Sequence, residues 1–289
     1  MLSTEDIQRK VRELEIKSRK ITSDLFTGEF HSAFKGKGMS FREVREYYPG
    51  DDVRFIDWNV SARFSHPFTK VFEEERELTV YLLVDVSASG LFGTTQHSKR
   101  DLITEMGAVL AFSAINNNDK VGAIFFSDKI EKYIQPKKGR QHALYIVREL
   151  LTATSTGKAT NMEEAIRFFN KTTRQKGVAF ILSDFMDVQY ENDLKVIGGR
   201  HDVIGLHVYD KMDMQLPPIG LMQVEDMETG ATVWIDSSNE LVRYNYHQQF
   251  IQRSTQCKNY FTKAGAELLN IRTDEDYVKI LQQFFLKRS

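Results

Sequence analysis

The chain has 289 residues, of which 41% are hydrophobic and 27% are charged, and its formal net charge is -1. This composition is typical of a folded globular protein and excludes disordered and fibrous chains. Acidic and basic residues are interleaved, so the chain lacks the broad basic field that drives nucleic-acid binding. The single cysteine, Cys257, excludes an internal disulfide and a zinc site built from several cysteines. We therefore expect no nucleic-acid partner and a reducing environment.

Residues 1–25 predict an amphipathic helix. One face carries residues at spacings of four and three, namely Ile7, Val11, Leu14, Ser18, Ile21 and Leu25. Ser3 or Thr4 could cap this helix, which we expect to pack on the body of the protein. The segment lacks the apolar core of a signal peptide, and no apolar run in the chain is long enough to span a bilayer. These features predict a soluble, cytoplasmic protein without direct membrane insertion.

Residues 26–77 are expected to form a β-rich segment. Residues 26–40 are rich in glycine, lysine and serine and read as a loop, and Pro49-Gly50 marks a turn farther along. Basic and acidic residues then alternate, at Arg42, Glu43, Arg45, Glu46, Asp51, Asp52, Arg54, Asp57 and Arg63. They could form a salt-bridged structural wall or a docking surface. Intermixed opposite charges neutralise one another, which favours the wall.

From residue 78 to residue 289, apolar runs alternate with amphipathic helical patterns. The alternation predicts a Rossmann-like α/β domain, whose central sheet is mostly parallel and has helices on both faces. The expected parallel strands are residues 78–84, 121–126, 178–182, 203–208 and 267–271. Residues 130–134 follow the second strand too closely for a helical crossover, so we expect them to form an antiparallel edge strand.

A hairpin insertion is expected near residues 215–237. It would pair residues 221–224 with residues 232–235 around Gly230, before a helix that starts near Ser238. The predicted organisation is therefore an N-terminal helix (residues 1–25), a β-rich segment (residues 26–77) and an α/β domain (residues 78–289).

The first strand of that domain ends in Asp85, which is followed at alternate positions by Ser87 and Ser89. Ligands of doubly wound sheets bind outside the carboxyl ends of the strands, where these three side chains can converge. One carboxylate and two hydroxyls suit a hard cation, Mg²⁺ before transition metals. In the alternative interpretation, Asp85 caps the next helix and the serines satisfy the backbone of a turn.

Two later segments deliver further oxygen atoms to the same edge of the sheet. Thr160 precedes a predicted helix, and Asp184 ends a second apolar strand. Each also has a simpler interpretation, Thr160 as a helix N-cap and Asp184 as a carboxylate at the end of a strand. Together with Asp85, Ser87 and Ser89 they form a candidate cation site.

These five residues resemble the metal-ion-dependent adhesion site of von Willebrand factor type A domains. Residues 119–128 also resemble the second strand of that fold, and the resemblance extends over residues 78–289. It implies that Ser87, Ser89 and Thr160 supply hydroxyl ligands to Mg²⁺, with Mn²⁺ or Ca²⁺ as alternatives. It further implies that Asp85 and Asp184 act largely through bound water, and that a protein partner supplies an Asp or Glu to the metal.

The remaining sequence points to a more specific family. Residues 41–63, 207–230 and 272–288 are similar to an uncharacterised bacterial family, called domain of unknown function fifty-eight, that contains such a domain. This resemblance implies an adaptor or co-chaperone of a MoxR-type AAA+ ATPase. Many members of the family carry membrane helices near the N-terminus. This chain departs from that pattern, because it lacks such helices.

Enzymatic alternatives have less support. A strand that ends in aspartate also opens phosphohydrolases of the haloacid-dehalogenase type, with Asp85 as nucleophile, but these need an acid two residues later, where Ser87 stands. The chain has no G-x-x-x-x-G-K-[ST], H-E-x-x-H or G-x-S-x-G motif. Its seven histidines have no paired zinc spacing, and we expect them at the surface or in local hydrogen bonds. We therefore expect a non-enzymatic interaction module.

Overall fold

The computed structural model describes residues 4–25, 40–64, 66–73, 77–94, 98–155, 157, 159–187, 189–225 and 230–288. The chain divides into two compact units. The body comprises Met1–Phe34 and Leu78–Ser289, and the small unit comprises Lys35–Glu77. The helices in the described ranges include none that is long and apolar enough to cross a membrane.

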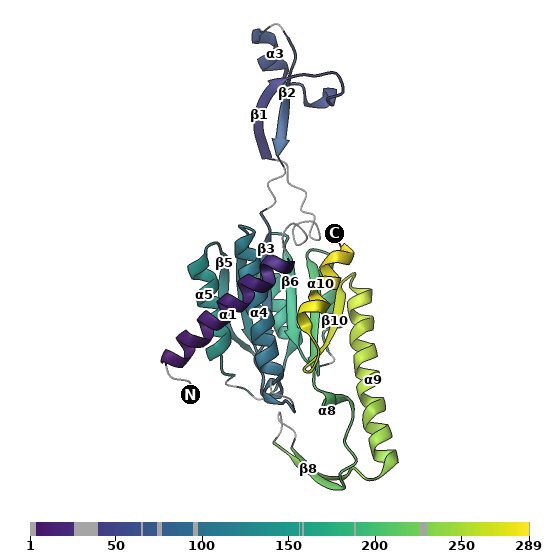
Figure 1. Ribbon diagram of the computed structural model, residues 1–289. Coiled ribbons are helices and arrows are strands. Elements are labelled where there is room, and N and C mark those ends of the chain that lie inside the picture. Colours follow the sequence, from purple (N-terminus) through teal and green to yellow (C-terminus); the bar gives the residue numbers. More distant parts are fainter. Residues whose placement is uncertain are drawn as a thin grey trace. The chain divides into compact units, whose positions relative to one another are not determined.

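A six-stranded sheet forms the centre of the body, in the order β10-β7-β6-β3-β4-β5 (Figure 1). Its strands are β3 (Thr79–Asp85), β4 (Lys120–Phe126), β5 (Ile130–Lys137), β6 (Val178–Ser183), β7 (Asp202–Tyr209) and β10 (Glu267–Arg272). All neighbouring pairs are parallel except β4 with β5, which is antiparallel. The expected fold class, a mostly parallel sheet with one antiparallel edge strand, is thus confirmed.

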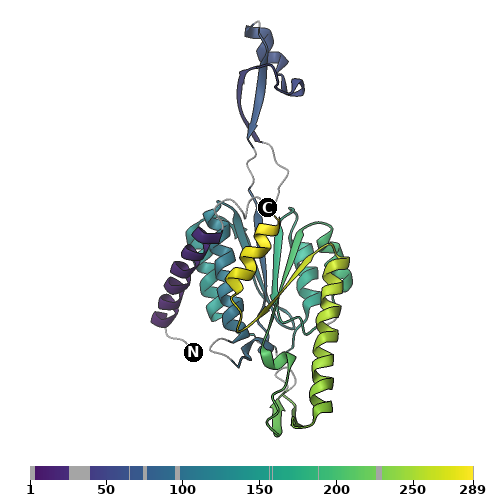
Figure 2. The same ribbon diagram turned by 45° about the vertical axis from the view of Figure 1, so that its right-hand side comes forward.

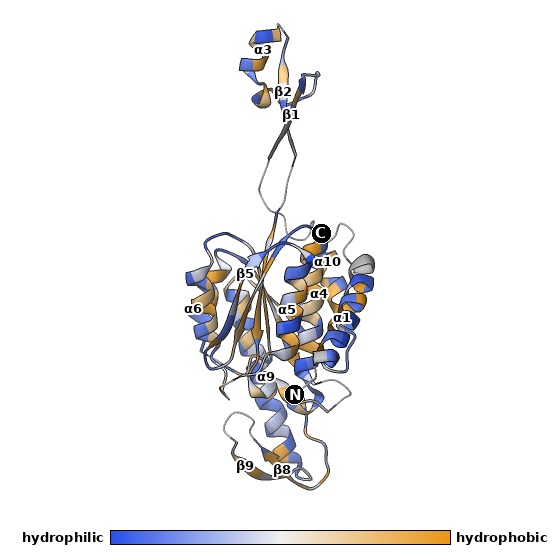
Figure 3. Cartoon of the chain, turned by 90° about the vertical axis from the view of Figure 1, so that its left-hand side faces the viewer, coloured by the Kyte–Doolittle hydropathy of each residue, from blue (hydrophilic) through white to orange (hydrophobic). Residues whose placement is uncertain are grey.

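Helices cover both faces of this sheet, which explains why its central strands are apolar on both sides. One apolar cluster joins the sheet to α4 (Lys99–Asn116), α5 (Arg140–Thr152) and α10 (Tyr277–Arg288). The other joins it to α6 (Met162–Thr172), α7 (Glu191–Gly198) and α9 (Glu240–Lys263). Figure 2 shows these layers from a second direction, and Figure 3 shows apolar residues concentrated between them.

The N-terminal helix α1 (Thr4–Leu25) packs on the outside of α4 and α5. Leu14 of α1 contacts a cluster that includes Phe112 of α4 and Val147 of α5. The opposite side of α4 faces the sheet, so this helix is enclosed on two sides. A helix enclosed in this way can be apolar around most of its circumference, which accounts for the many apolar residues of α4.

A two-stranded hairpin of the body follows the carboxyl end of β7. It follows α8 (Lys211–Met214) and pairs β8 (Leu221–Glu225) with β9 (Thr232–Asp236) in antiparallel register. The long helix α9 then begins at Glu240, with Asn239 as its N-cap. The hairpin therefore belongs to the connection between β7 and α9. This connection starts at the carboxyl ends of the strands, where the candidate site was expected.

The small unit contains less β structure than the sequence suggested. Strands β1 (Ser40–Glu46) and β2 (Phe68–Glu73) pair antiparallel, but η1 (Val53–Phe55) and α3 (Trp58–Phe64) lie between them. Aspartates start both helical segments, because Asp52 accepts a hydrogen bond from the backbone of Arg54 and Asp57 accepts one from that of Asn59. Both short segments were missed.

Several charged residues of this unit pair with one another. Arg45 donates two hydrogen bonds of 2.8 Å to Asp51, and Arg54 lies 2.6 Å from Asp52. These contacts agree with the interpretation of a salt-bridged wall.

Two histidines of the body, His201 and His207, are buried and differ in their environments. The Nδ1 atom of His207 lies 2.9 Å from Oδ1 of Asn270, in a local hydrogen bond of the kind that was expected. His201 is 3% exposed, and neither of its ring nitrogens has a hydrogen-bond partner in the described structure. It packs against the rings of Tyr81 and Phe169. The expectation for His201 was therefore wrong, because its ring serves as an apolar surface.

Candidate functional site

The carboxyl ends of β3, β4 and β6 lie side by side at one edge of the sheet. Asp85 is paired with Phe126 of β4, and Val84 is paired with Leu182 of β6. The backbone N–H of Val86 continues this contact by donating to the carbonyl of Phe126 across 2.8 Å. Loops that leave these three strands therefore start close together, as expected for parallel strands.

Asp85 is buried, and both of its carboxylate oxygens accept hydrogen bonds. Oδ1 accepts from the backbone N–H of Ser87 at 2.9 Å, and Oδ2 accepts from Oγ of Ser183 at 2.6 Å. Burial and the nearby charge of Asp184 raise the pKa of Asp85 above its ordinary value.

Asp85 does not cap a helix. The short segment η2 (Ala88–Leu91) has Ser87 at its N-cap position, and α4 is capped by Ser98. The capping interpretation of Asp85 is therefore wrong. The alternative interpretation had the serines satisfy the backbone of the turn, whereas the carboxylate of Asp85 accepts the bond from the backbone of Ser87, and the side chain of Ser87 makes no cap bond.

The hydroxyls of Ser87 and Ser89 lie next to each other, with 3.0 Å between the two Oγ atoms. Ser87 is 2% exposed, so its oxygen faces the interior of this edge. In an octahedral Mg²⁺ site with metal–oxygen distances of about 2.1 Å, neighbouring ligand oxygens lie about 3 Å apart. The spacing of the two serines thus fits two adjacent ligand positions.

Asp184 is buried beside them, and its two oxygen atoms differ in their contacts. Its Oδ2 accepts a hydrogen bond of 2.8 Å from the ammonium of Lys99. Its Oδ1 is buried and has no hydrogen-bond partner within the part of the chain that the structure describes. Burial raises the pKa of Asp184, but the Lys99 ammonium and the nearby Ser89 hydroxyl outweigh burial and lower it. Asp184 is therefore an ionised carboxylate, and its Oδ1 has no hydrogen-bond donor among the described residues.

Thr160 belongs to a loop that reaches the same edge. The next residue, Asn161, is the N-cap of α6, so the interpretation of Thr160 as the cap is wrong. The backbone N–H of Asn161 donates to the carbonyl of Ser127 across 2.8 Å, which holds the loop against the end of β4. Asp187 accepts a 2.9 Å bond from the backbone of Met162 and thereby ties the loop after β6 to the start of α6.

Three residues of this edge were not identified from the sequence. Ser183 positions Asp85, Lys99 pairs with Asp184, and Asp213 of α8 lies 3.2 Å from the same ammonium. Ser183 had a signal, because it is a polar residue at the end of a buried strand. Lys99 and Asp213 had none, since a charged residue in the first turn of a helix is ordinarily solvated.

The donor set of this edge suits a hard cation. The described residues include no group of three or more His, Cys, Asp and Glu that could hold a metal ion. Any cation here would therefore depend on hydroxyl oxygens in addition to carboxylates. Ser87, Ser89 and the free oxygen of Asp184 provide such a mixed set, which fits Mg²⁺ better than zinc or copper.

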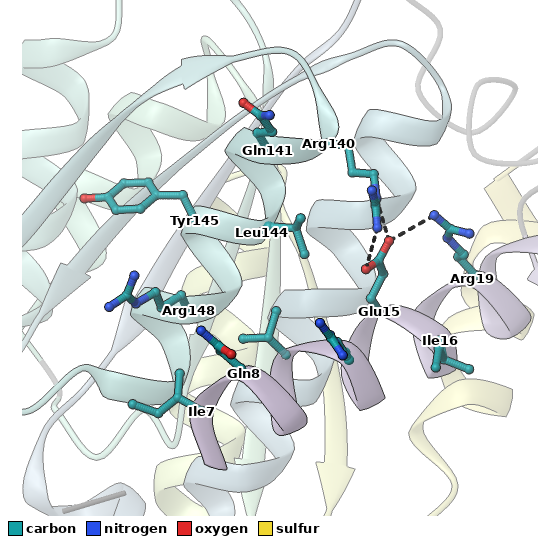
Figure 4. A pocket seen from close by; sticks show the side chains of 12 residues that line it. Ile7, Gln8, Glu15, Ile16, Arg19, Arg140, Gln141, Leu144, Tyr145 and Arg148 are labelled. Carbon is teal, nitrogen blue, oxygen red and sulfur yellow. Dashed lines mark hydrogen bonds and ion pairs between the residues drawn. The ribbon is translucent and has the colours of Figure 1, made fainter. Parts of the chain in front are cut away.

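A groove lies elsewhere on the body, between α1 and α5, with a volume of about 660 Å³ (Figure 4). Apolar side chains such as Ile7 and Leu144 line it, and Glu15 forms ion pairs with Arg140 and Arg19 beside them. None of its lining residues belongs to the candidate cation site. The groove thus adds no ligand to that site.

Comparisons with known proteins found several that are similar to this chain. An uncharacterized protein of Mycobacterium tuberculosis is 30% identical over 281 residues, which cover 96% of this chain and 88% of the relative. The structure of an aerotolerance-related membrane protein from Bacteroides fragilis matches with a TM-score of 0.51 and 14% identity, over 73% of this chain and 99% of that one. Because the identity is only 14%, this match shows a shared fold and nothing about function. A von Willebrand factor type A protein from Catenulispora acidiphila matches with a TM-score of 0.39 and 8% identity, over 76% of this chain and 43% of that one.

The sequence profile of the family described as "Protein of unknown function DUF58" matches residues 43–256. This region begins in the small unit, includes Asp85 and Asp184, and extends into α9. The profile thus joins the small unit to the α/β body, as the resemblance in sequence implied. Because the match covers most of the chain, this protein belongs to the DUF58 family.

Proposed function

We propose that this protein is a non-enzymatic, Mg²⁺-dependent protein-interaction module. The observation that carries the proposal is the pair of hydroxyls of Ser87 and Ser89, 3.0 Å apart, beside a buried Asp184 whose Oδ1 has no hydrogen-bond partner among the described residues. Asp85, Ser87, Ser89, Thr160 and Asp184 would hold the ion, and Mn²⁺ or Ca²⁺ are alternatives to Mg²⁺.

Such a ligand set favours binding over catalysis. Neutral hydroxyls leave much of the charge on a cation, which can then attract an anionic oxygen from another molecule. We infer that a partner protein supplies this oxygen from an Asp or Glu side chain. The ion would bridge the two proteins, and the chain's own residues would hold the ion in place, the two aspartates largely through bound water.

A MoxR-type AAA+ ATPase is the partner that we propose, with this protein as its adaptor or co-chaperone. The support is the resemblance of residues 41–63, 207–230 and 272–288 to the family, to which the chain belongs. The expected absence of nucleic-acid partners and of direct membrane insertion, and the expected cytoplasmic location, stay predictions.

The phosphohydrolase alternative gains no specific support. Both oxygens of Asp85 accept hydrogen bonds from the chain itself, and the position of the required acid is taken by Ser87. A nucleophilic carboxylate needs an accessible oxygen, whereas Asp85 is 4% exposed.

Capture of the purified ATPase by the immobilised chain would test the proposal. The assay is run without nucleotide, so that Mg²⁺ acts only on this protein, and compares Mg²⁺ with a chelator. We expect capture in Mg²⁺, its loss with the chelator and its loss in Asp184→Ala. Asp193→Ala, a change in α7 at an exposed ion pair with Arg167, is the matched control and should capture normally. Equal capture by wild type and Asp184→Ala would contradict the proposal.

A further inference from the structure

Lys99 is a buried cation at the candidate site. Its side chain is 4% exposed, and its Nζ lies 2.8 Å from Oδ2 of Asp184 and 3.2 Å from Oδ2 of Asp213. Fully buried lysines are rare, and the first turn of a helix repels positive charge. Lys99 is nevertheless the first residue of α4. The two carboxylates compensate for this placement, helped by the ring of Phe92, whose centroid lies 5.8 Å from Nζ, and they raise the pKa of Lys99 in spite of burial.

The same ammonium shares Asp184 with the proposed metal. One oxygen of Asp184 binds Lys99, and the other is buried without a hydrogen-bond partner in the described residues. A second cationic side chain, that of Arg100, is half-buried and interacts with the charge of Asp85. The edge therefore already contains positive charge close to the two aspartates that would attract a divalent ion.

We propose that Lys99 is an internal counter-ion that neutralises Asp184 in the metal-free protein and weakens the binding of Mg²⁺. As a consequence, the cation binds tightly only together with the carboxylate of a partner. This inference rests on the proposed metal site. Two cations that share one carboxylate repel each other, and an additional carboxylate from the partner offsets that repulsion. Because coupling between ligands is reciprocal, Mg²⁺ then strengthens partner binding by the same factor.

The affinity for Mg²⁺ alone, measured by titration calorimetry at low ionic strength, tests this role. We expect Lys99→Met to bind Mg²⁺ at least about tenfold more tightly than the wild type. Lys99→Arg keeps the charge and should stay within about threefold of the wild type. Lys263→Met removes an exposed lysine at the end of α9 and controls for the change in net charge. It should also stay within about threefold.

A double variant addresses the stability of the site. Lys99→Met leaves Asp184 and Asp213 unpaired and could prevent folding. Lys99→Met combined with Asp213→Asn removes the ammonium together with its second partner and restores the wild-type net charge. Asn can still accept the 2.8 Å bond from the backbone of Asp210. We expect this double variant to bind Mg²⁺ about tenfold more tightly than the wild type, and Mg²⁺ to raise its melting temperature more.

The outcomes separate this inference from the proposed function. If the wild type binds Mg²⁺, Asp184→Ala does not, and removal of Lys99 leaves the affinity unchanged, the role of Lys99 is overturned while the metal site stands. If Lys99→Arg tightens binding as much as Lys99→Met, the effect is one of packing and the role of the charge is overturned. If neither the wild type nor any variant without Lys99 binds Mg²⁺, the metal site itself is wrong and this inference fails with it.

Discussion

Oγ of Ser183 donates a 2.6 Å hydrogen bond to Oδ2 of Asp85, and this bond joins the carboxyl ends of β6 and β3. Ser183 is fully buried, and its Oγ also accepts a bond from the backbone of Phe185. One hydroxyl thus orients the buried carboxylate of Asp85 and shapes the loop that carries Asp184. Ser183 thus helps to position both acidic residues of the candidate site, because it bonds to Asp85 and directly precedes Asp184.

Replacement of Ser183 by alanine should destabilise the protein. The change leaves Oδ2 of Asp85 buried without its donor, which typically costs about 1–3 kcal/mol in the free energy of unfolding. Urea denaturation would measure the loss. Ser238→Ala, at an exposed serine after β9, should change stability by less than about 0.5 kcal/mol. Equal effects of the two substitutions would show that the bond to Asp85 contributes nothing.

The two serines of the candidate site should matter for the metal more than for the fold. We expect Ser87→Ala and Ser89→Ala each to weaken Mg²⁺ binding at least about tenfold, because each removes one oxygen ligand. Titration calorimetry gives the affinities, and the melting temperature in chelator shows whether the fold is intact. Unchanged affinity in both variants would exclude the serines as ligands.

The buried ring of His201 should make the protein sensitive to acid. Burial, helped by the charge of Arg200, lowers the pKa of His201 from 6.5 to about 4, so the folded state holds the ring neutral. The unfolded chain binds a proton at its ordinary pKa of about 6.5, hence this contribution to stability is complete above that pH. It decreases as the pH falls from about 6.5 toward 4, by at most about 3 kcal/mol.

His201→Phe tests this dependence, since phenylalanine can fill the same space against Tyr81 and Phe169 without titrating. Urea unfolding between pH 7 and pH 4 should show a shallower loss of stability in the variant. If stability fell equally steeply with pH in both proteins, His201 would bind a proton as readily in the folded as in the unfolded state, and the prediction would be wrong.

The N-terminal helix should contribute to the stability of the body through one face only. Leu14 is 9% exposed and packs on α4 and α5, whereas Ile16, two residues later, is 70% exposed. We expect Leu14→Ala to lower the free energy of unfolding by about 2–3 kcal/mol and Ile16→Ala to change it by less than about 0.5 kcal/mol. Thermal denaturation of the two variants provides the comparison. A large effect of Ile16→Ala instead would place the opposite face of α1 in the interior.

Much of the fold could be predicted from the sequence, because each strand of the central sheet is a short apolar run with turn signals around it. The antiparallel β5 followed from its short distance to β4, although it extends to Lys137 and not only to residue 134. The small unit was harder, since its strands β1 and β2 pair across an intervening segment that contains the Pro49-Gly50 turn. Neighbouring residues carry no signal of such a pairing.

For the candidate site, the sequence by itself determined which oxygen atoms follow the buried strands. Asp85, Ser87, Ser89 and Asp184 end or follow β3 and β6, and parallel strands bring their carboxyl ends to one edge. Only the tertiary structure decided how these groups are paired. Lys99 and Asp184 are 85 positions apart, and nothing in the periodicity of α4 marks its first residue as buried. Burial and pairing of a charge depend on residues distant in sequence, so the internal ammonium became evident only in the folded chain.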